Sequence, residues 1–113
     1  MKMIVAVIQP EKLDEVRQAL IDTGISRVTV TRVTGHGRQE DIDLYRGQEV
    51  VPDLLTKVRL EVALNDAFVE PAIEAICKAA KNNGGKIGDG KIFVLPLEKV
   101  VRIRTGETGG DAV

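Results

Sequence analysis

The chain of 113 residues suits a single domain spanning residues 1–113, and its core must be mainly aliphatic because it has one tyrosine, two phenylalanines and no tryptophan. Its formal net charge of −1 argues against a nucleic-acid-binding protein, which usually has a basic excess. The single cysteine, Cys77, excludes a disulfide bond within the chain, and its apolar helical setting predicts a buried, unreactive thiol.

The first half of the chain predicts a strand, a helix and a second strand. Residues 3–8 form an apolar run rich in branched side chains, too short for a signal peptide or a membrane span, so we expect a cytoplasmic protein with no membrane insertion. Pro10 opens the helix and Gly24 can end it in a left-handed conformation. Residues 27–33 are β-branched enough to predict the second strand. The expected buried face of the helix consists of Leu13, Val16, Leu20 and Ile21.

A long connection follows the second strand, over residues 36–56, and shows no sustained helical or strand period. A loop of ~20 residues is uncommon inside a compact domain and is usually functional or disordered. A solvated hairpin extension is the alternative. His36 lies between two glycines, which is more typical of a loop residue than of a metal ligand.

The second half predicts another strand, helix and strand. Residues 57–64 alternate between apolar and polar side chains, as in a strand with one covered face. Asn65 and Asp66 offer a helix cap, but Pro71 then requires that the helix begin nearer Phe68 or bend at its start. The buried face of this helix is expected to contain Val69, Ala72, Ile73, Ile76, Cys77 and Ala80.

The loop before the last main strand has a composition that suits phosphate. Residues 84–91 contain four glycines and two lysines, so the backbone can fold round an anion and present amide groups and positive charges to it. The letters fit GxxxxGK, but Ile92 replaces the magnesium-binding hydroxyl of a P-loop, and the order is helix to strand. We therefore reject a P-loop nucleoside triphosphatase. An ordinary glycine-rich turn is the alternative.

The C-terminal region predicts a strand over residues 92–95, a short alternating run over residues 100–104 and a polar tail over residues 105–113. Arg102 and Arg104 would lie on one face of that run, where two guanidinium groups suit a polyphosphate. Charges that protect an exposed sheet edge are the alternative interpretation.

The element order predicts an α+β, ferredoxin-like βαββαβ fold with a short extra C-terminal strand. In this fold Lys57, the Gly35-His36-Gly37-Arg38-Gln39 segment and the glycine-rich loop converge at one end of the sheet. The face of the sheet away from the helices would be uncovered, which favours an oligomer.

No catalytic set emerges, so we expect a protein that is not an enzyme. The acids Asp41, Asp43 and Glu49 have no base or nucleophile fixed beside them. No cluster of histidine, cysteine and acidic residues has metal-ligand spacing, so a metal would be held mainly by the phosphates of a ligand.

The chain resembles the P-II nitrogen-regulatory signal proteins of the GlnB and GlnK type. Residues 86–94 and 102–107 look like the two signatures of that family almost letter for letter. Gly35-x-Gly37-Arg38-Gln39, Leu44-Tyr45-Arg46-Gly47 and Lys57 also fall where the family pattern has them, so the resemblance covers essentially the whole chain.

The resemblance implies a homotrimer that binds ATP or ADP in clefts between subunits. Residues 82–91 would be the B-loop and residues 36–56 the T-loop. On this basis the nucleotide site comprises Thr29, Gly35, Gly37, Arg38, Glu61, Gly88, Asp89, Gly90, Lys91 and, from the adjacent subunit, Arg102 and Arg104. The effector 2-oxoglutarate would bind beside Mg²⁺ and ATP, through Gln39, Lys57 and Gly88, with Gln39 also near the metal. The T-loop would dock on an ammonium channel, a kinase or a metabolic enzyme, through Tyr45, Arg46, Gly47 and Glu49.

Four departures from the family pattern limit what the resemblance implies for this chain. Val50 stands where the family has the uridylylated tyrosine, and Gln48 where some members have a phosphorylated serine, so neither modification is chemically available. The T-loop is one residue short near residues 40–43, and Gly84-Gly85-Lys86 replaces the usual Thr-Gly-Lys.

These departures leave several functions open. A divergent adenylate sensor for another pathway, such as bicarbonate metabolism, is the main alternative to nitrogen regulation. An ATP hydrolase and a purely structural trimer are two further hypotheses.

Overall fold

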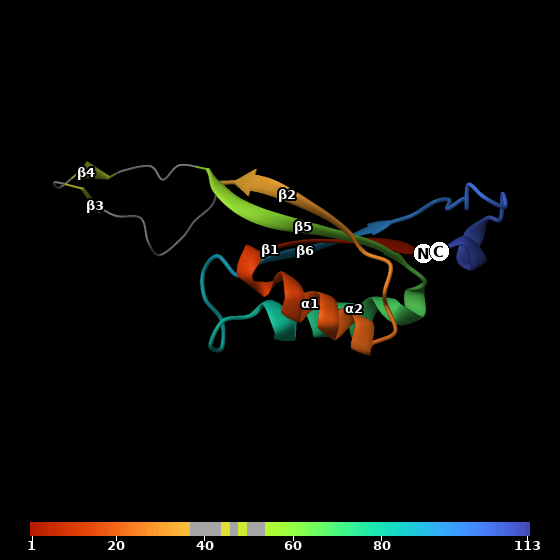
Figure 1. The fold of residues 1–113 in the computed structure, drawn as a ribbon, viewed down its shortest axis with the longest axis horizontal. Coiled ribbons are helices and arrows are strands. Elements are labelled where there is room, and N and C mark those ends of the chain that lie inside the picture. Colours follow the sequence, from red (N-terminus) through yellow and green to blue (C-terminus); the bar gives the residue numbers. More distant parts are fainter. Residues whose placement is uncertain (37–43, 46–47, 50–53) are drawn as a thin grey trace.

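The computed structural model describes residues 1–36, 44–45, 48–49 and 54–113, and shows one antiparallel sheet with two helices on one of its faces (Figure 1). The strands occur in the spatial order β2-β5-β1-β6. This arrangement confirms the predicted α+β, ferredoxin-like fold. The main elements are β1 (Lys2–Ile8), α1 (Leu13–Asp22), β2 (Thr29–Gly35), β5 (Leu55–Leu64), α2 (Val69–Ala80) and β6 (Gly90–Pro96).

Shorter elements complete the description. Two-residue strands β3 (Leu44–Tyr45) and β4 (Gln48–Glu49) pair with each other within the long connection between β2 and β5. Because β5 begins at Leu55, the last residues of the predicted loop 36–56 belong to a strand. Within the described ranges, 3₁₀ helices span Pro10–Lys12, Asp66–Phe68 and Gly109–Ala112.

The core lies between the sheet and the helices. Alternate residues of each strand face the helices. On this face Ile4 of β1 lies opposite Val62 of β5, and Ala6 lies opposite Leu60. The helices contribute buried residues that pack against these strand residues: Val16 and Leu20 of α1, and Ala72, Ile76 and Ala80 of α2. No polar side chain is buried among the described residues. Non-directional apolar packing therefore holds this layer together.

The end of α1 was predicted correctly. Gly24 has a φ of +87°, its amide donates to the Ile21 carbonyl at 2.9 Å, and the Ile25 amide donates to the Leu20 carbonyl at 2.9 Å. This is the Schellman pattern that a glycine just past a helix permits. Ile25 is buried against Leu20 in the core, so the same turn also directs the chain back to the sheet.

Three predictions about the helices need correction. Cys77 is exposed rather than buried. The buried residues of α2 are spaced four apart, at Ala72, Ile76 and Ala80, and Cys77 lies to one side of that line. Ile21 is likewise exposed. No side chain caps α2, which begins at Val69 and so confirms a start near Phe68. Asn65 instead donates to the Gly110 carbonyl at 3.1 Å.

Candidate functional site

The glycine-rich connection between α2 and β6 has a fixed, strongly bent backbone. Five of its residues have positive φ: 42° at Asn83, 83° at Gly84, 116° at Gly85, 100° at Gly88 and 124° at Gly90. Glycine adopts these angles without steric cost, which explains the composition. In Figure 1 this connection lies at the end of the molecule where β2 ends and β5 begins. The end of β2 at Gly35, the start of β5 near Lys57 and the glycine-rich loop therefore lie at one end of the sheet, as predicted, while residues 37–39 of the predicted set lie outside the described residues.

Asp89 closes this loop on itself. Its Oδ2 accepts hydrogen bonds from the Lys86 amide at 2.8 Å and the Asn82 amide at 3.2 Å, and its Oδ1 accepts one from Asn82 Nδ2 at 2.8 Å. The bond from the Lys86 amide, with those from Asn82, lowers the pKa of the Asp89 carboxyl below its ordinary value of 3.8. The carboxylate therefore stabilises the loop above that value, and its contribution is lost as the pH falls through the lower folded pKa.

Strand β1 and Gln9, the residue that follows it, hold the other side of the loop. Gln9 Nε2 donates to the Gly88 carbonyl at 2.8 Å. Gly90 pairs with Ile8 and packs directly on β1, so that a Cβ at Gly90 would collide with the carbonyl oxygen of Val7. Glycine is therefore required at this position both by its φ and by the space available.

We expect Gly90→Ala to lower the free energy of unfolding by about 2–4 kcal/mol, because backbone strain and overpacking each cost roughly 1–3 kcal/mol. Gly84→Ala is the matched control, since Gly84 also has positive φ but nothing within 4 Å of a built Cβ. Urea unfolding of both variants measures the difference. Equal losses would show that the contact with Val7 does not constrain the loop.

The open face of the sheet, opposite the helices, carries several of the predicted site residues in two rows. Thr31, Arg59, Val7 and Lys91 form one row across the four strands, and Thr29, Glu61, Val5 and Phe93 form the next. Same-face neighbours along a strand are ~7 Å apart. Thr29 thus lies opposite Glu61, whereas Lys91 lies in the next row and on β6, at the opposite edge of the sheet from β2.

Glu61 has a partner that the sequence did not reveal. Arg59 Nε lies 2.9 Å from Glu61 Oε1, and both residues belong to the open face of β5. Their i, i+2 spacing in an alternating strand is the only sequence signal for this pair. The ion pair leaves Glu61 oriented beside Thr29, with which it pairs across the strands.

Lys57 and Gly35 come together where β2 and β5 meet the long connection. Lys57 pairs with Val33, and a Cβ at Gly35 would be 3.7 Å from Lys57 Cγ. The other predicted residues of this region, Gly37, Arg38, Gln39, Arg46, Gly47 and Val50, lie outside the described residues. Tyr45 and Glu49 belong to β3 and β4.

The C-terminal segment corrects one prediction. In place of the expected extra strand there is a single β-bridge between Val101 and Thr108. Residues 103–105 form a turn, across which the Arg102 amide donates a hydrogen bond to the Glu107 carbonyl at 2.9 Å. Arg102 and Arg104 therefore do not project from one face of a strand. Gly106, with a φ of 73°, permits the turn.

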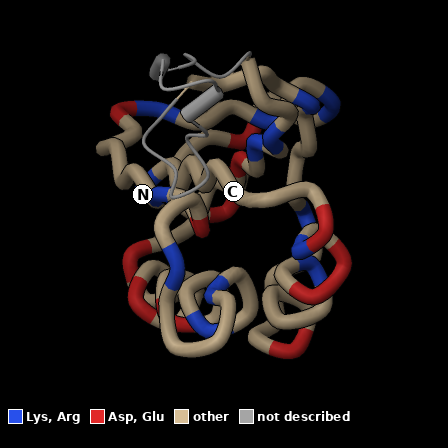
Figure 2. Tube along the Cα trace, turned by 90° about the vertical axis from the view of Figure 1, so that its left-hand side faces the viewer, with Lys and Arg blue, Asp and Glu red and all other residues tan. Residues whose placement is uncertain are grey.

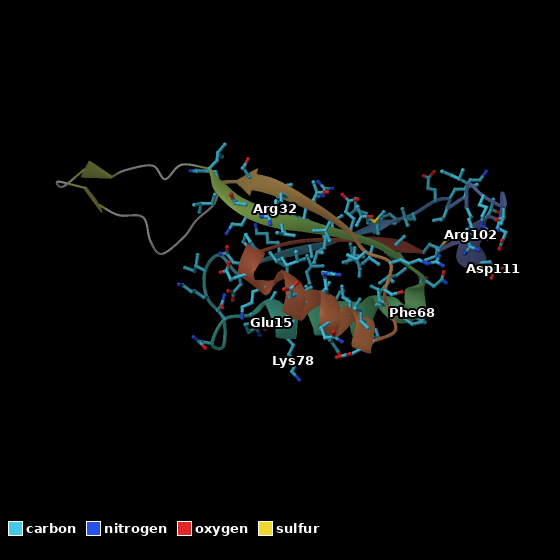
Figure 3. All side chains as sticks on the ribbon, in the orientation of Figure 1. Glu15, Arg32, Phe68, Lys78, Arg102 and Asp111 are labelled. Carbon is cyan, nitrogen blue, oxygen red and sulfur yellow. The ribbon has the colours of Figure 1, made fainter. Side chains whose placement is uncertain are left out.

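Arg102 is already held by its own segment. Its Nη1 lies 3.4 Å from Glu107 Oε1, and its Nη2 donates to the Asp111 carbonyl at 3.0 Å. Arg102 and Asp111 are labelled in Figure 3. This segment lies at the opposite end of the molecule from the glycine-rich loop (Figure 1). Within one chain the two arginines and the loop are thus apart, and only a second chain could bring them together.

The distribution of charge and of metal-binding side chains also bears on which functions are plausible. Figure 2 shows Lys, Arg, Asp and Glu interspersed over the described part of the chain, unlike the single basic face of a nucleic-acid binder. Among those residues no three His, Cys, Asp or Glu side chains group as metal ligands. No helix described here is long and apolar enough to cross a membrane.

Comparisons with known proteins agree with this fold. A profile of the family described as "Nitrogen regulatory protein P-II" matches residues 1–107. The chain is 59% identical to the "Nitrogen regulatory protein P-II" of Azospirillum brasilense and 60% identical to that of Mesorhizobium japonicum, over 100% of each chain. It is 50% identical to "Nitrogen regulatory protein GlnK1" of Methanosarcina mazei, over 100% of this chain and 97% of the relative. The chain therefore belongs to the P-II family of nitrogen regulatory proteins.

Proposed function

We propose that this member of the P-II family senses ATP, ADP and 2-oxoglutarate, and passes the signal to proteins of nitrogen metabolism through the T-loop, residues 36–56. The family comprises regulatory proteins rather than enzymes, so binding is the activity to explain. The observation that carries the proposal is the glycine-rich loop, whose bent backbone suits a phosphate group.

The loop offers the chemistry that phosphate requires. Its glycines place no side chain over the backbone, and the exposed Lys86 and Lys91 add positive charge. Gly88, Gly90 and Lys91 would bind the phosphates, together with Gly37 and Arg38. Thr29 and Glu61, adjacent on the open face, would lie near the adenine and ribose.

A trimer would complete this site. Phe93 and Leu95 of β6 are 51% and 46% exposed on the open face, and Ile103 of the C-terminal segment is fully exposed. Apolar exposure of this kind marks an association surface. Pairing of open faces between subunits would bring Arg102 and Arg104 of one chain to the glycine-rich loop of the next, which a single chain cannot do.

The family resemblance assigns the second effector to Lys57 and Gln39, and the partner to the T-loop. Lys57 and Gln39 would hold 2-oxoglutarate next to Mg²⁺ and ATP, with Gly88 nearby, and Gln39 would also contact the metal. Docking on an ammonium channel, a kinase or a metabolic enzyme would use Tyr45, Arg46, Gly47 and Glu49. Because Val50 replaces the modified tyrosine, the response would depend on ligands rather than on uridylylation.

A second candidate is an adenylate sensor for another pathway, such as bicarbonate metabolism. The shortened T-loop and Val50 favour it, because both depart from the nitrogen-regulatory pattern. Calorimetric titration of the purified protein with ATP tests what the two candidates share. Micromolar affinity is expected, and no binding of any adenine nucleotide would contradict both.

A further inference from the structure

Asp89 is an unexpected residue for a loop that binds phosphate. It lies between Gly88 and Gly90 and precedes Lys91, at the centre of the segment to which the phosphates are assigned. A carboxylate close to a phosphate repels it, so on charge alone Asp89 weakens nucleotide binding. A compensating role is needed to explain an acid at this position.

The hydrogen bonds of Asp89 supply that role. Both carboxylate oxygens face the loop itself, where three donors from Asn82 and Lys86 fill them at 2.8–3.2 Å. Two backbone bonds tighten the same ring, from the Gly85 amide to the Asn82 carbonyl at 2.8 Å and from the Asp89 amide to the Lys86 carbonyl at 3.1 Å. The carboxylate thus organises the loop from within.

Four glycines make such an organiser necessary. A glycine-rich segment has wide conformational freedom, and ordering it on ligand binding would weaken the affinity. Hydrogen bonds to a charged acceptor are stronger than neutral ones, so a carboxylate fixes the loop better than an amide or hydroxyl would. Gln9 adds a second anchor by occupying the Gly88 carbonyl oxygen, which would otherwise repel an anion.

We propose that Asp89 is a positioning residue that does not contact the nucleotide, and that it holds residues 82–90, with the help of Gln9, in the shape that binds phosphate before the ligand arrives. This inference rests on the proposed nucleotide binding. It replaces the expectation that Asp89 belongs to the contact surface for ATP.

The direction in which one substitution changes the affinity for ATP distinguishes a purely electrostatic effect of Asp89 from a positioning role. Asp89→Asn removes a negative charge, so a purely electrostatic view predicts tighter ATP binding. A positioning role predicts ATP binding about ten-fold weaker, because the neutral amide cannot accept from all three donors. Binding of adenosine, which has no phosphate, should not change. Glu74→Gln on α2 is the control for the same loss of charge, since Glu74 is exposed.

A second variant separates geometry from charge. Asn82→Ala removes the side-chain donor to Asp89 and keeps the carboxylate, so it should also weaken ATP and not adenosine. Hydrogen exchange of the nucleotide-free protein should show faster exchange of the Lys86 amide in both variants. This second readout needs no ligand.

The outcomes are distinct. Faster exchange with weaker ATP binding in both variants supports the inference. Unchanged exchange, or ATP binding by Asp89→Asn as tight as in the unchanged protein, overturns it, as does an equal loss for adenosine. If the unchanged protein binds no ATP, the proposed function fails, and the positioning role fails with it for that separate reason.

Discussion

Phe93→Asp is expected to separate the proposed trimer into monomers. Phe93 lies beside Val5 on the open face of the sheet, and a charge buried there between chains would have no partner. Because the side chain is 51% exposed in the single chain, the monomer should still fold. Size-exclusion chromatography with light scattering should show one chain of 12.3 kDa rather than three.

Phe68→Asp is the matched control for this prediction. Phe68 is 43% exposed and lies on the helix side of the molecule, as Figure 3 shows. Its substitution removes a similar apolar surface and adds the same charge away from the open face. A trimer that survives Phe93→Asp, or one that is lost equally in both variants, would contradict the assignment of the open face as the interface.

The double substitution Arg102→Ala with Arg104→Ala is expected to weaken ATP binding by about 100-fold or more, since a hydrogen bond to a charged group contributes roughly 1.5–3 kcal/mol. AMP should lose much less affinity, because the two guanidinium groups would face the distal phosphates. Calorimetry with both nucleotides measures the ratio.

The control removes the same two charges elsewhere. Arg17→Ala with Lys78→Ala removes two exposed positive charges from α1 and α2, which lie on the other face of the sheet. Equal losses for ATP and AMP in the Arg102 and Arg104 variant would rule out their placement at the distal phosphates. A trimer check is needed alongside, because Arg102 also binds Glu107 and the Asp111 carbonyl.

The sequence was sufficient for the main elements, because their signals are local. Alternation in β5 and the glycine after α1 each depend on a few neighbouring residues, and both were predicted correctly. The exposure of Cys77 was not predictable in this way. Helical periodicity identifies the centre of a buried face, but the packing of α2 on the sheet decides where that face ends.

The site shows the same division between local and tertiary signals. The composition of residues 84–91 predicted a phosphate site, and the family resemblance added Asp89 to it. The bonds from Asn82 to Asp89 could not be predicted, because they are set by how the loop closes. Alternating residues suggested a strand for Arg102 and Arg104, whereas the bridge from Val101 to Thr108 shows a turn. Gln9 was missed because it lies 79 residues from its partner Gly88.

Calorimetry of ATP binding in the presence of Mg²⁺, with and without 2-oxoglutarate, tests the central claim most directly. The account predicts that ATP binds with micromolar affinity and that 2-oxoglutarate binds only when Mg²⁺ and ATP are both present. Bicarbonate, added separately, should then give no heat. Binding of ATP without any response to 2-oxoglutarate would contradict nitrogen sensing through Gln39 and Lys57, and would favour an adenylate sensor of another pathway.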